Sequence, residues 1–139
     1  MGDAKILRVL LDTNVLLWSQ NEPEKLGKKA AAILLDPKNA RYISSISVLE
    51  IGQLIFANKL VFSISVEKWL RDTSEALRLE EITVSSNIAL SAYQLPGNLH
   101  RDPADRIIVS TARELDMSVL TCDEKILSYK EVRSIDARK

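Results

Sequence analysis

The chain of 139 residues has little of what several enzyme classes need. With one cysteine it can form no internal disulfide and no cysteine-rich zinc site, which suits a reducing cytoplasm. Its one histidine, His100, is the only candidate base for a Ser–His or Cys–His hydrolase, and no Gly-x-Ser-x-Gly elbow is present. The four glycines form no loop that would cradle a phosphate.

Long apolar runs and an excess of one charge are also missing. No apolar run approaches the ~18 residues of a membrane span, and the N-terminus lacks an apolar leader, so we expect a cytoplasmic protein. Lys plus Arg and Asp plus Glu are 19 each, so the net charge gives no support for nucleic-acid binding. It does not exclude such binding, because a local patch of positive charge would suffice. The length and the apolar fraction of 46% fit one domain over residues 1–139.

Apolar stretches of strand length alternate with stretches of helical periodicity. The expected strands cover residues 5–11, 41–44, 82–84, 118–122 and 132–135, and the expected helices cover a short segment after Asp12 and residues 24–35, 47–58, 65–78, 86–95 and 103–115. The clearest strands are apolar throughout rather than alternating. This pattern is typical of an α/β protein whose parallel sheet is covered by helices on both faces.

Acidic residues stand where such a fold brings distant segments together. Asp12 and Asp123 each end an apolar strand, Asp105 opens the helix before the last clear strand, and Glu50 lies about one turn inside another helix. In a parallel sheet these positions share the carboxyl edge, whereas Asp116 precedes a strand and belongs to the opposite edge. Carboxylates gathered there repel one another unless a hard divalent cation neutralises them.

Each acid also has a simpler structural explanation. Asp12 and Asp123 could cap the helices that follow them, and Asp102 with Pro103 is a common helix start that an acid three residues later would strengthen. Glu50 is harder to explain in this way, because it interrupts a mostly apolar helix with no Lys or Arg within one turn.

Four segments together resemble the acidic motifs of a known family. They are Leu10-Leu11-Asp12-Thr13-Asn14-Val15-Leu16, Ser47-Val48-Leu49-Glu50-Ile51, His100-Arg101-Asp102-Pro103-Ala104-Asp105-Arg106 and Leu120-Thr121-Cys122-Asp123. In order and spacing they are similar to those of PIN-domain nucleases, above all the VapC-type toxins of toxin–antitoxin systems. The chain departs from the pattern at Ala104, where an aromatic residue is commoner, and at Cys122, and neither is a ligand position.

The resemblance implies a three-layer α/β/α sandwich with a central, mainly parallel sheet of four to five strands. It implies an endoribonuclease, a hydrolase in which Asp12, Glu50, Asp105 and Asp123 bind Mg²⁺ or Mn²⁺, with Asp102 as an additional acid. Such an ion makes water more acidic and offsets charge on a phosphate. We expect Asp12, Asp105 and Asp123 as direct ligands, and Glu50 either as a ligand or holding a water.

Further roles are expected around this cluster. Thr13, Asn14 and Thr121 could hold the carboxylates by hydrogen bonds, although each has an equally good capping or turn role. Arg101, Arg106, Lys125 and His100 could contact RNA phosphates. The resemblance also implies a homodimer and a small antitoxin that lays an apolar segment across exposed grooves and places a basic side chain in the acidic site. Exposed Leu and Ile on the helices expected at 47–58 and 65–78 could receive this segment, although core packing explains these residues equally well.

Two other functions remain open from the sequence. A phosphatase with Asp12 as nucleophile commonly has a second Asp two residues on, where this chain has Asn14. A non-catalytic PIN-like module for binding or dimerisation would have no need of the complete acidic set.

Overall fold

The computed structural model describes residues 6–139, and residue 5, where the first strand was expected to begin, lies outside the described residues. The strands are β1 (Arg8–Leu11), β2 (Ala40–Ser44), β3 (Leu79–Ile82), β4 (Ser118–Thr121) and β5 (Ser134–Asp136). The helices are α1 (Thr13–Asn21), α2 (Lys28–Leu35), α3 (Ser45–Phe56), α4 (Val66–Leu77), α5 (Ser86–Ser91), α6 (Pro103–Glu114) and α7 (Glu124–Leu127), with a 3₁₀ turn η1 (Pro23–Lys25).

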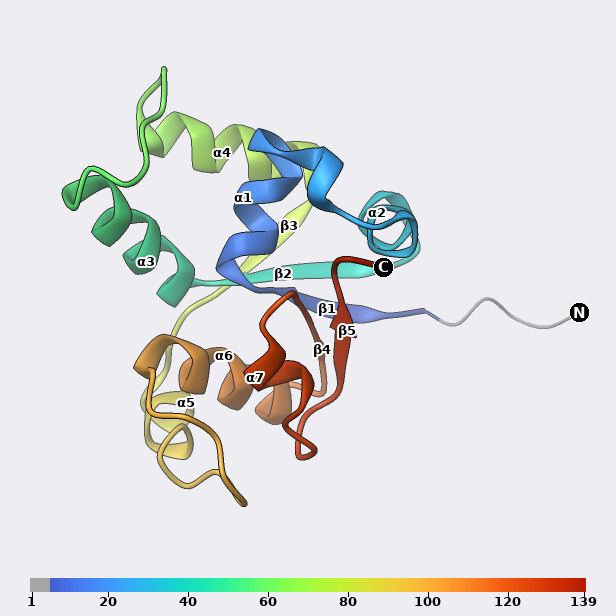
Figure 1. Ribbon diagram of the computed structural model, residues 1–139, viewed down its shortest axis with the longest axis vertical. Helices are drawn as coiled ribbons and strands as arrows, with labels where there is room; N and C mark the ends of the chain where they lie inside the picture. Colours follow the sequence, from blue (N-terminus) through green and yellow to red (C-terminus); the bar gives the residue numbers. More distant parts are fainter. Residues whose placement is uncertain (1–5) are drawn as a thin grey trace, which may run out of the picture.

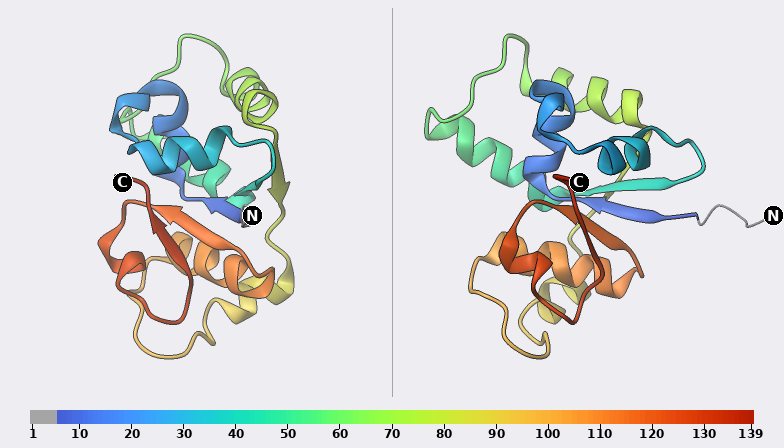
Figure 2. Two further views of the ribbon diagram at one scale, coloured as in Figure 1. Left: turned by 90° about the vertical axis from the view of Figure 1, so that its right-hand side faces the viewer. Right: turned by 45° about the vertical axis from the view of Figure 1, so that its right-hand side comes forward.

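All five strands form one sheet in the order β3-β2-β1-β4-β5, and every neighbouring pair is parallel. Helices α1, α2 and α4 cover one face of the sheet, and α5, α6 and α7 cover the other (Figures 1 and 2). Helix α3 leaves the carboxyl end of β2 and extends beyond the sheet (Figure 1). The expected α/β/α sandwich is therefore confirmed, with a sheet of five strands.

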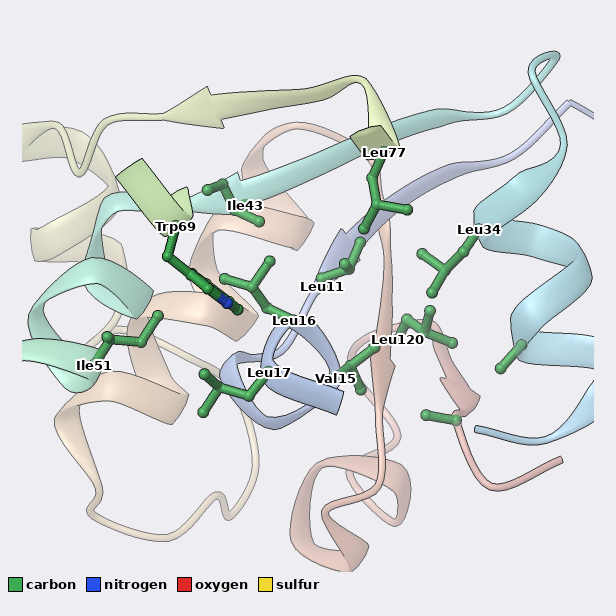
Figure 3. Close-up of a cluster of buried hydrophobic side chains, with 12 residues drawn as sticks. Leu11, Val15, Leu16, Leu17, Leu34, Ile43, Ile51, Trp69, Leu77 and Leu120 are labelled. Atoms are coloured by element: carbon green, nitrogen blue, oxygen red, sulfur yellow. The ribbon is translucent and has the colours of Figure 1, made fainter. Parts of the chain in front are cut away.

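The central strand β1 supplies both cores. Adjacent side chains of a strand point to opposite faces, so Leu11 enters the core beneath α1 and α4 while Leu10 enters the core beneath α6. Figure 3 shows the first of these cores, where Leu16 of α1 and Trp69 of α4 lie near Leu11. Each large apolar side chain buried in this way contributes about 1.5–3 kcal/mol to folding.

The helix expected at 86–95 ends at Ser91, the strand expected at 132–135 is β5 (Ser134–Asp136), and two further elements differ more from the sequence prediction. The helix expected at 24–35 is divided into η1 and α2, because the chain passes the C-terminal segment at Gly27, whose N–H donates to the carbonyl of Ala137 over 2.9 Å. A Cβ at Gly27 would overlap the backbone of Lys139. The strand expected at 82–84 begins earlier, as β3 (Leu79–Ile82). It does so because Arg78 adopts a left-handed conformation (φ 52°) that turns the end of α4 directly into the strand.

Three strands pass into helices with almost no intervening loop. Strand β1 leads through Asp12 into α1, β2 leads directly into α3, and β4 leads through Cys122 and Asp123 into α7. These helices therefore begin at the carboxyl edge of the sheet, the edge at which ligand sites of parallel sheets lie. No helix among residues 6–139 has the length and apolar character that crossing a membrane requires.

Candidate active site

A cleft of about 400 Å³ opens at the carboxyl edge of the sheet. Its lining consists of Asp12, Thr13, Asn14, Glu50, Gln53, Leu54, Ala57, Lys59, Asp102, Asp105 and Asp123. All five acids singled out in the sequence lie on this lining, although they come from four separate segments of the chain. Asp116 does not line the cleft, and its carboxylate pairs with Arg133 at the surface.

Asp12 is buried at the junction of β1 and α1, and both of its carboxylate oxygens accept hydrogen bonds. Oδ1 accepts from the backbone N–H of Thr13 at 2.8 Å, and Oδ2 accepts from the hydroxyl of Thr121 at 2.6 Å. Each oxygen has a second lone pair. Asp12 can therefore cap α1 and still present oxygen atoms to a cation.

Glu50 reaches the cleft from the second turn of α3 and is only partly buried. Its Oε1 accepts a hydrogen bond from the hydroxyl of Thr13, which also lies 2.8 Å from the hydroxyl of Ser47. The side chain of Thr13 thus connects α1 with α3 and orients Glu50. The hydrogen bonds predicted for Thr13 and Thr121 are both present.

Asp102 and Asp123 each use one oxygen to cap a helix. Oδ1 of Asp102 accepts from the backbone N–H of Ala104 at 3.0 Å at the start of α6, and Oδ1 of Asp123 accepts from Lys125 N–H at 2.8 Å at the start of α7. Within the described residues, Oδ2 of each has no hydrogen-bond partner. The structural and the ligand interpretations of these acids are therefore compatible.

Asp105 lies in the first turn of α6, and only 12% of its side chain is exposed. Its Oδ2 lies 2.6 Å from Nε2 of His100. One ligand atom each of His100, Asp105 and Asp123 lie within 4.8 Å of one another. The sequence suggested a phosphate contact for His100, and it gave no sign of this contact with a carboxylate.

Burial and repulsion from neighbouring carboxylates raise the pKa of three acids of the cleft, Asp12, Glu50 and Asp105. Burial raises the pKa of Asp12, although the hydrogen bonds from Thr121 and Thr13 lower it. Burial also raises the pKa of Glu50, although its hydrogen bond from Thr13 lowers it. Burial raises the pKa of Asp105 to about 7, opposed by His100 and reinforced by the neighbouring acids. The cleft therefore carries negative charge only at an energetic cost, which a bound cation would remove.

The residues predicted to contact RNA differ in how accessible they are. Arg101 and Lys125 are exposed near the cleft, Arg101 directly before Asp102 and Lys125 two residues after Asp123. Arg106 is half-buried and donates to main-chain carbonyls, so this geometry gives no support to its predicted contact with RNA. Asn14 is exposed on the lining of the cleft, with no side-chain hydrogen bond among the described residues.

Lys59 is a cleft residue that sequence reasoning missed. It is exposed on the cleft lining and is the one cationic residue of that lining. Asn58, in a left-handed conformation (φ 56°), ends α3 so that the N–H of Lys59 returns to the carbonyl of Leu54 at 2.9 Å. The dipeptide Asn58-Lys59 after an apolar helix was the available signal, because Asn favours this conformation.

The donor set of the cleft fits a hard divalent cation. Carboxylate oxygens of Asp12, Asp102, Asp105 and Asp123 are the ligands that Mg²⁺ and Mn²⁺ prefer, and Glu50 adds a fifth carboxylate. Hydrogen bonds with Thr13, Thr121 and His100 hold three of these acids in orientation, as partners of metal ligands commonly do.

A parallel sheet between two helix layers, with carboxylates converging at its carboxyl edge, defines an α/β protein whose acidic cleft suits divalent cations. The chain belongs to the PIN domain family, whose family model matches residues 9–132. It is 32% identical over 127 residues to Ribonuclease VapC22 of Mycobacterium tuberculosis, a match that covers 91% of this chain and 95% of that protein. The family expected from the four motifs is therefore confirmed.

Solved structures share the fold over nearly the whole chain. VapBC2 from Rickettsia felis, bound to a DNA fragment from its promoter, matches with a TM-score of 0.67 and 19% identity over 94% of this chain and 98% of that chain. DNA-bound VapBC from Salmonella typhimurium matches with a TM-score of 0.65 and 24% identity over the same shares of the two chains. At these identities the likeness is one of fold.

Proposed function

We propose that this protein is a Mg²⁺- or Mn²⁺-dependent endoribonuclease and the toxin of a toxin–antitoxin pair. The observation that carries the proposal is the cleft of about 400 Å³ in which five carboxylates from four distant segments meet. Membership of the PIN domain family and the likeness to Ribonuclease VapC22 support the reaction. The zero net charge does not oppose it, because binding of a cation would make the cleft accept a phosphate.

In this proposal Asp12, Asp105 and Asp123 hold the cation, and Asp102 adds an oxygen at the rim of the cleft. When bound, a divalent cation supplies Lewis acidity, which makes water more acidic and neutralises charge on the phosphate. Glu50 has Oε1 fixed by Thr13, which leaves Oε2 to orient the water that attacks the phosphodiester bond.

Cationic side chains around the cleft would hold the RNA backbone. Lys59 lies on the lining of the cleft, and Arg101 and Lys125 are exposed near the cleft. The ammonium and guanidinium groups of these three residues can contact phosphate oxygens. In the metal-free protein the carboxylates oppose this contact, so binding of RNA and binding of the cation should strengthen one another.

An antitoxin partner is supported by the solved neighbours, which are named as VapBC complexes. On this chain an apolar hollow of about 260 Å³ lies between the end of α3 and the start of α4, and its lining includes Leu60, Val61 and Ile64. It suits the apolar segment expected of an antitoxin. The homodimer and the cytoplasmic location stay predictions.

The test is a cleavage assay on structured RNAs with Mg²⁺, Mn²⁺ or EDTA. We expect the native protein to cleave with either metal and to stop in EDTA, and we expect Asp12→Asn and Asp105→Asn to lose cleavage while keeping the native circular dichroism. Asp116→Asn is the matched control, because Asp116 lies outside the cleft and should keep full activity.

Two results would favour the other functions. A trapped phospho-aspartate at Asp12 would point to a phosphatase, which Asn14 makes a poor fit. A purified protein that binds metal but is inert on varied RNAs would point to a binding or dimerisation module.

A further inference from the structure

His100 makes one of the closest polar contacts in the protein with a carboxylate of the cleft. Its Nε2 lies 2.6 Å from Oδ2 of Asp105, and the two side chains are only 20% and 12% exposed. At this distance, away from most of the solvent, a ring nitrogen and a carboxylate form a strong, directional hydrogen bond. The imidazole therefore restricts how the carboxylate of Asp105 can rotate.

The surroundings of the ring decide which nitrogen carries the proton. Nδ1 of His100 is buried and has no hydrogen-bond partner within the described residues. A proton on Nδ1 would leave a buried donor unpaired, which folded proteins avoid more strictly than an unpaired acceptor. A neutral imidazole with its proton on Nε2 satisfies the one contact that the ring makes, because Nε2–H then donates to Asp105.

The backbone that carries this ring is held from helix α6 itself. Arg106, next to Asp105, donates to the carbonyl oxygens of Leu99 at 2.9 Å and His100 at 3.2 Å. Its Nε donates to the carbonyl of Ala92 at 2.8 Å, and its guanidinium lies over the ring of Tyr93. The loop before α6 is thus folded back on the first turn of the helix, and His100 reaches Asp105 from a fixed position.

We propose that His100 is a positioning residue of the metal site, which holds Oδ2 of Asp105 through Nε2–H and leaves Oδ1 for the cation. Arg106 supports this role indirectly, because it holds the loop that carries His100. This inference rests on the proposed function, because it concerns the cation that the cleft would hold. Loss of such a supporting hydrogen bond typically weakens metal binding by about 10–100-fold.

The first test measures Mn²⁺ affinity by calorimetry in three variants. His100→Leu removes the donor and should weaken binding by about 10–100-fold. His100→Gln, whose amide nitrogen lies near the position of Nε2, should restore most of the affinity. Asn98→Leu changes an exposed residue of the same loop and should bind Mn²⁺ as the native protein does. Equal affinity of the native protein and His100→Leu would overturn the inference.

The second test needs no variant, since the chain has one histidine. In protein labelled with ¹⁵N-histidine and freed of any histidine tag, the imidazole nitrogens should show a proton on Nε2 and none on Nδ1, and saturating Mg²⁺ should leave this pattern unchanged. Loss of the Nε2 proton when Mg²⁺ binds would mean that His100 is itself a ligand, which contradicts a positioning role.

The outcomes separate this inference from the proposed function. A native protein that binds neither Mn²⁺ nor Mg²⁺ would remove both. A native protein that binds metal and cleaves RNA, with a His100→Leu variant of equal metal affinity, would remove the inference alone. Metal binding with the expected loss in His100→Leu, but no cleavage of RNA, would keep the inference and remove the nuclease.

Discussion

Asp105 should destabilise the metal-free protein at neutral and alkaline pH. Burial raises its pKa from 3.8 to about 7, so the folded protein retains a proton that the unfolded chain releases. The free energy of unfolding therefore falls as the pH rises from about 4 to about 7, and the loss is complete above that range. Asp12 and Glu50, whose pKa values are also raised, act in the same direction. Asp105→Asn removes the ionisation and should stabilise the metal-free fold.

The size of the effect follows from the same shift. A rise from 3.8 to about 7 corresponds to at most about 4 kcal/mol, at about 1.4 kcal/mol for each pH unit. Solvent that enters the open cleft screens the charge, which reduces the expected gain to about 1–2 kcal/mol at pH 8. At pH 5 the carboxyl group is largely protonated, so the gain from Asp105→Asn should be smaller there.

The assay is urea unfolding in EDTA at pH 5 and pH 8, followed by circular dichroism. Asp116→Asn is the control, because Asp116 is exposed at the opposite edge of the sheet, and it should change the free energy of unfolding by less than about 0.5 kcal/mol at either pH. Mn²⁺ should stabilise the native protein and do so far less in Asp105→Asn. If Asp105→Asn is no more stable than the native protein at pH 8, or gains equally at both pH values, the electrostatic account is wrong.

Three further results are expected. Thr121→Val should lower RNA cleavage about 10–100-fold with an unchanged fold, because Asp12 loses its hydroxyl partner; full activity would contradict this. Gly27→Ala should lower the free energy of unfolding by about 1–3 kcal/mol, because its Cβ would overlap the C-terminal backbone. Gly52→Ala, in open space within α3, should raise the free energy of unfolding by up to about 1 kcal/mol in the same urea unfolding assay. Lys59→Met should weaken RNA binding while strengthening Mn²⁺ binding, and parallel losses of both would refute a phosphate contact.

Much of the site could be predicted because it follows from topology. In a parallel sheet, a residue that ends a strand or opens the next helix must lie at one edge, whatever the loops do. That rule alone predicts that Asp12, Asp105 and Asp123 lie together. It also separated Asp116 from them, and the structure has it in a surface ion pair outside the cleft.

The contacts that were missed depend on backbone conformations that leave weak signals in sequence. His100 reaches Asp105 because a guanidinium holds three main-chain carbonyls of the preceding loop, and such long-range bonds have no periodicity to detect. Strand β3 was placed too late because its exposed Glu80 and Glu81 hide an edge strand, and only the left-handed Arg78 reveals where α4 ends.

The order of the strands also determines when the acidic cleft can be completed during synthesis of the chain. Strand β1 carries the first acid but lies in the middle of the sheet, where its neighbour β4 is made more than one hundred residues later. Until β4 inserts beside it, Asp12 lacks Thr121, and Asp123 is not yet present. A ribosome that stalls before this point releases a fragment without the complete set of cleft acids, so under the proposed function a prematurely ended message should yield no active nuclease.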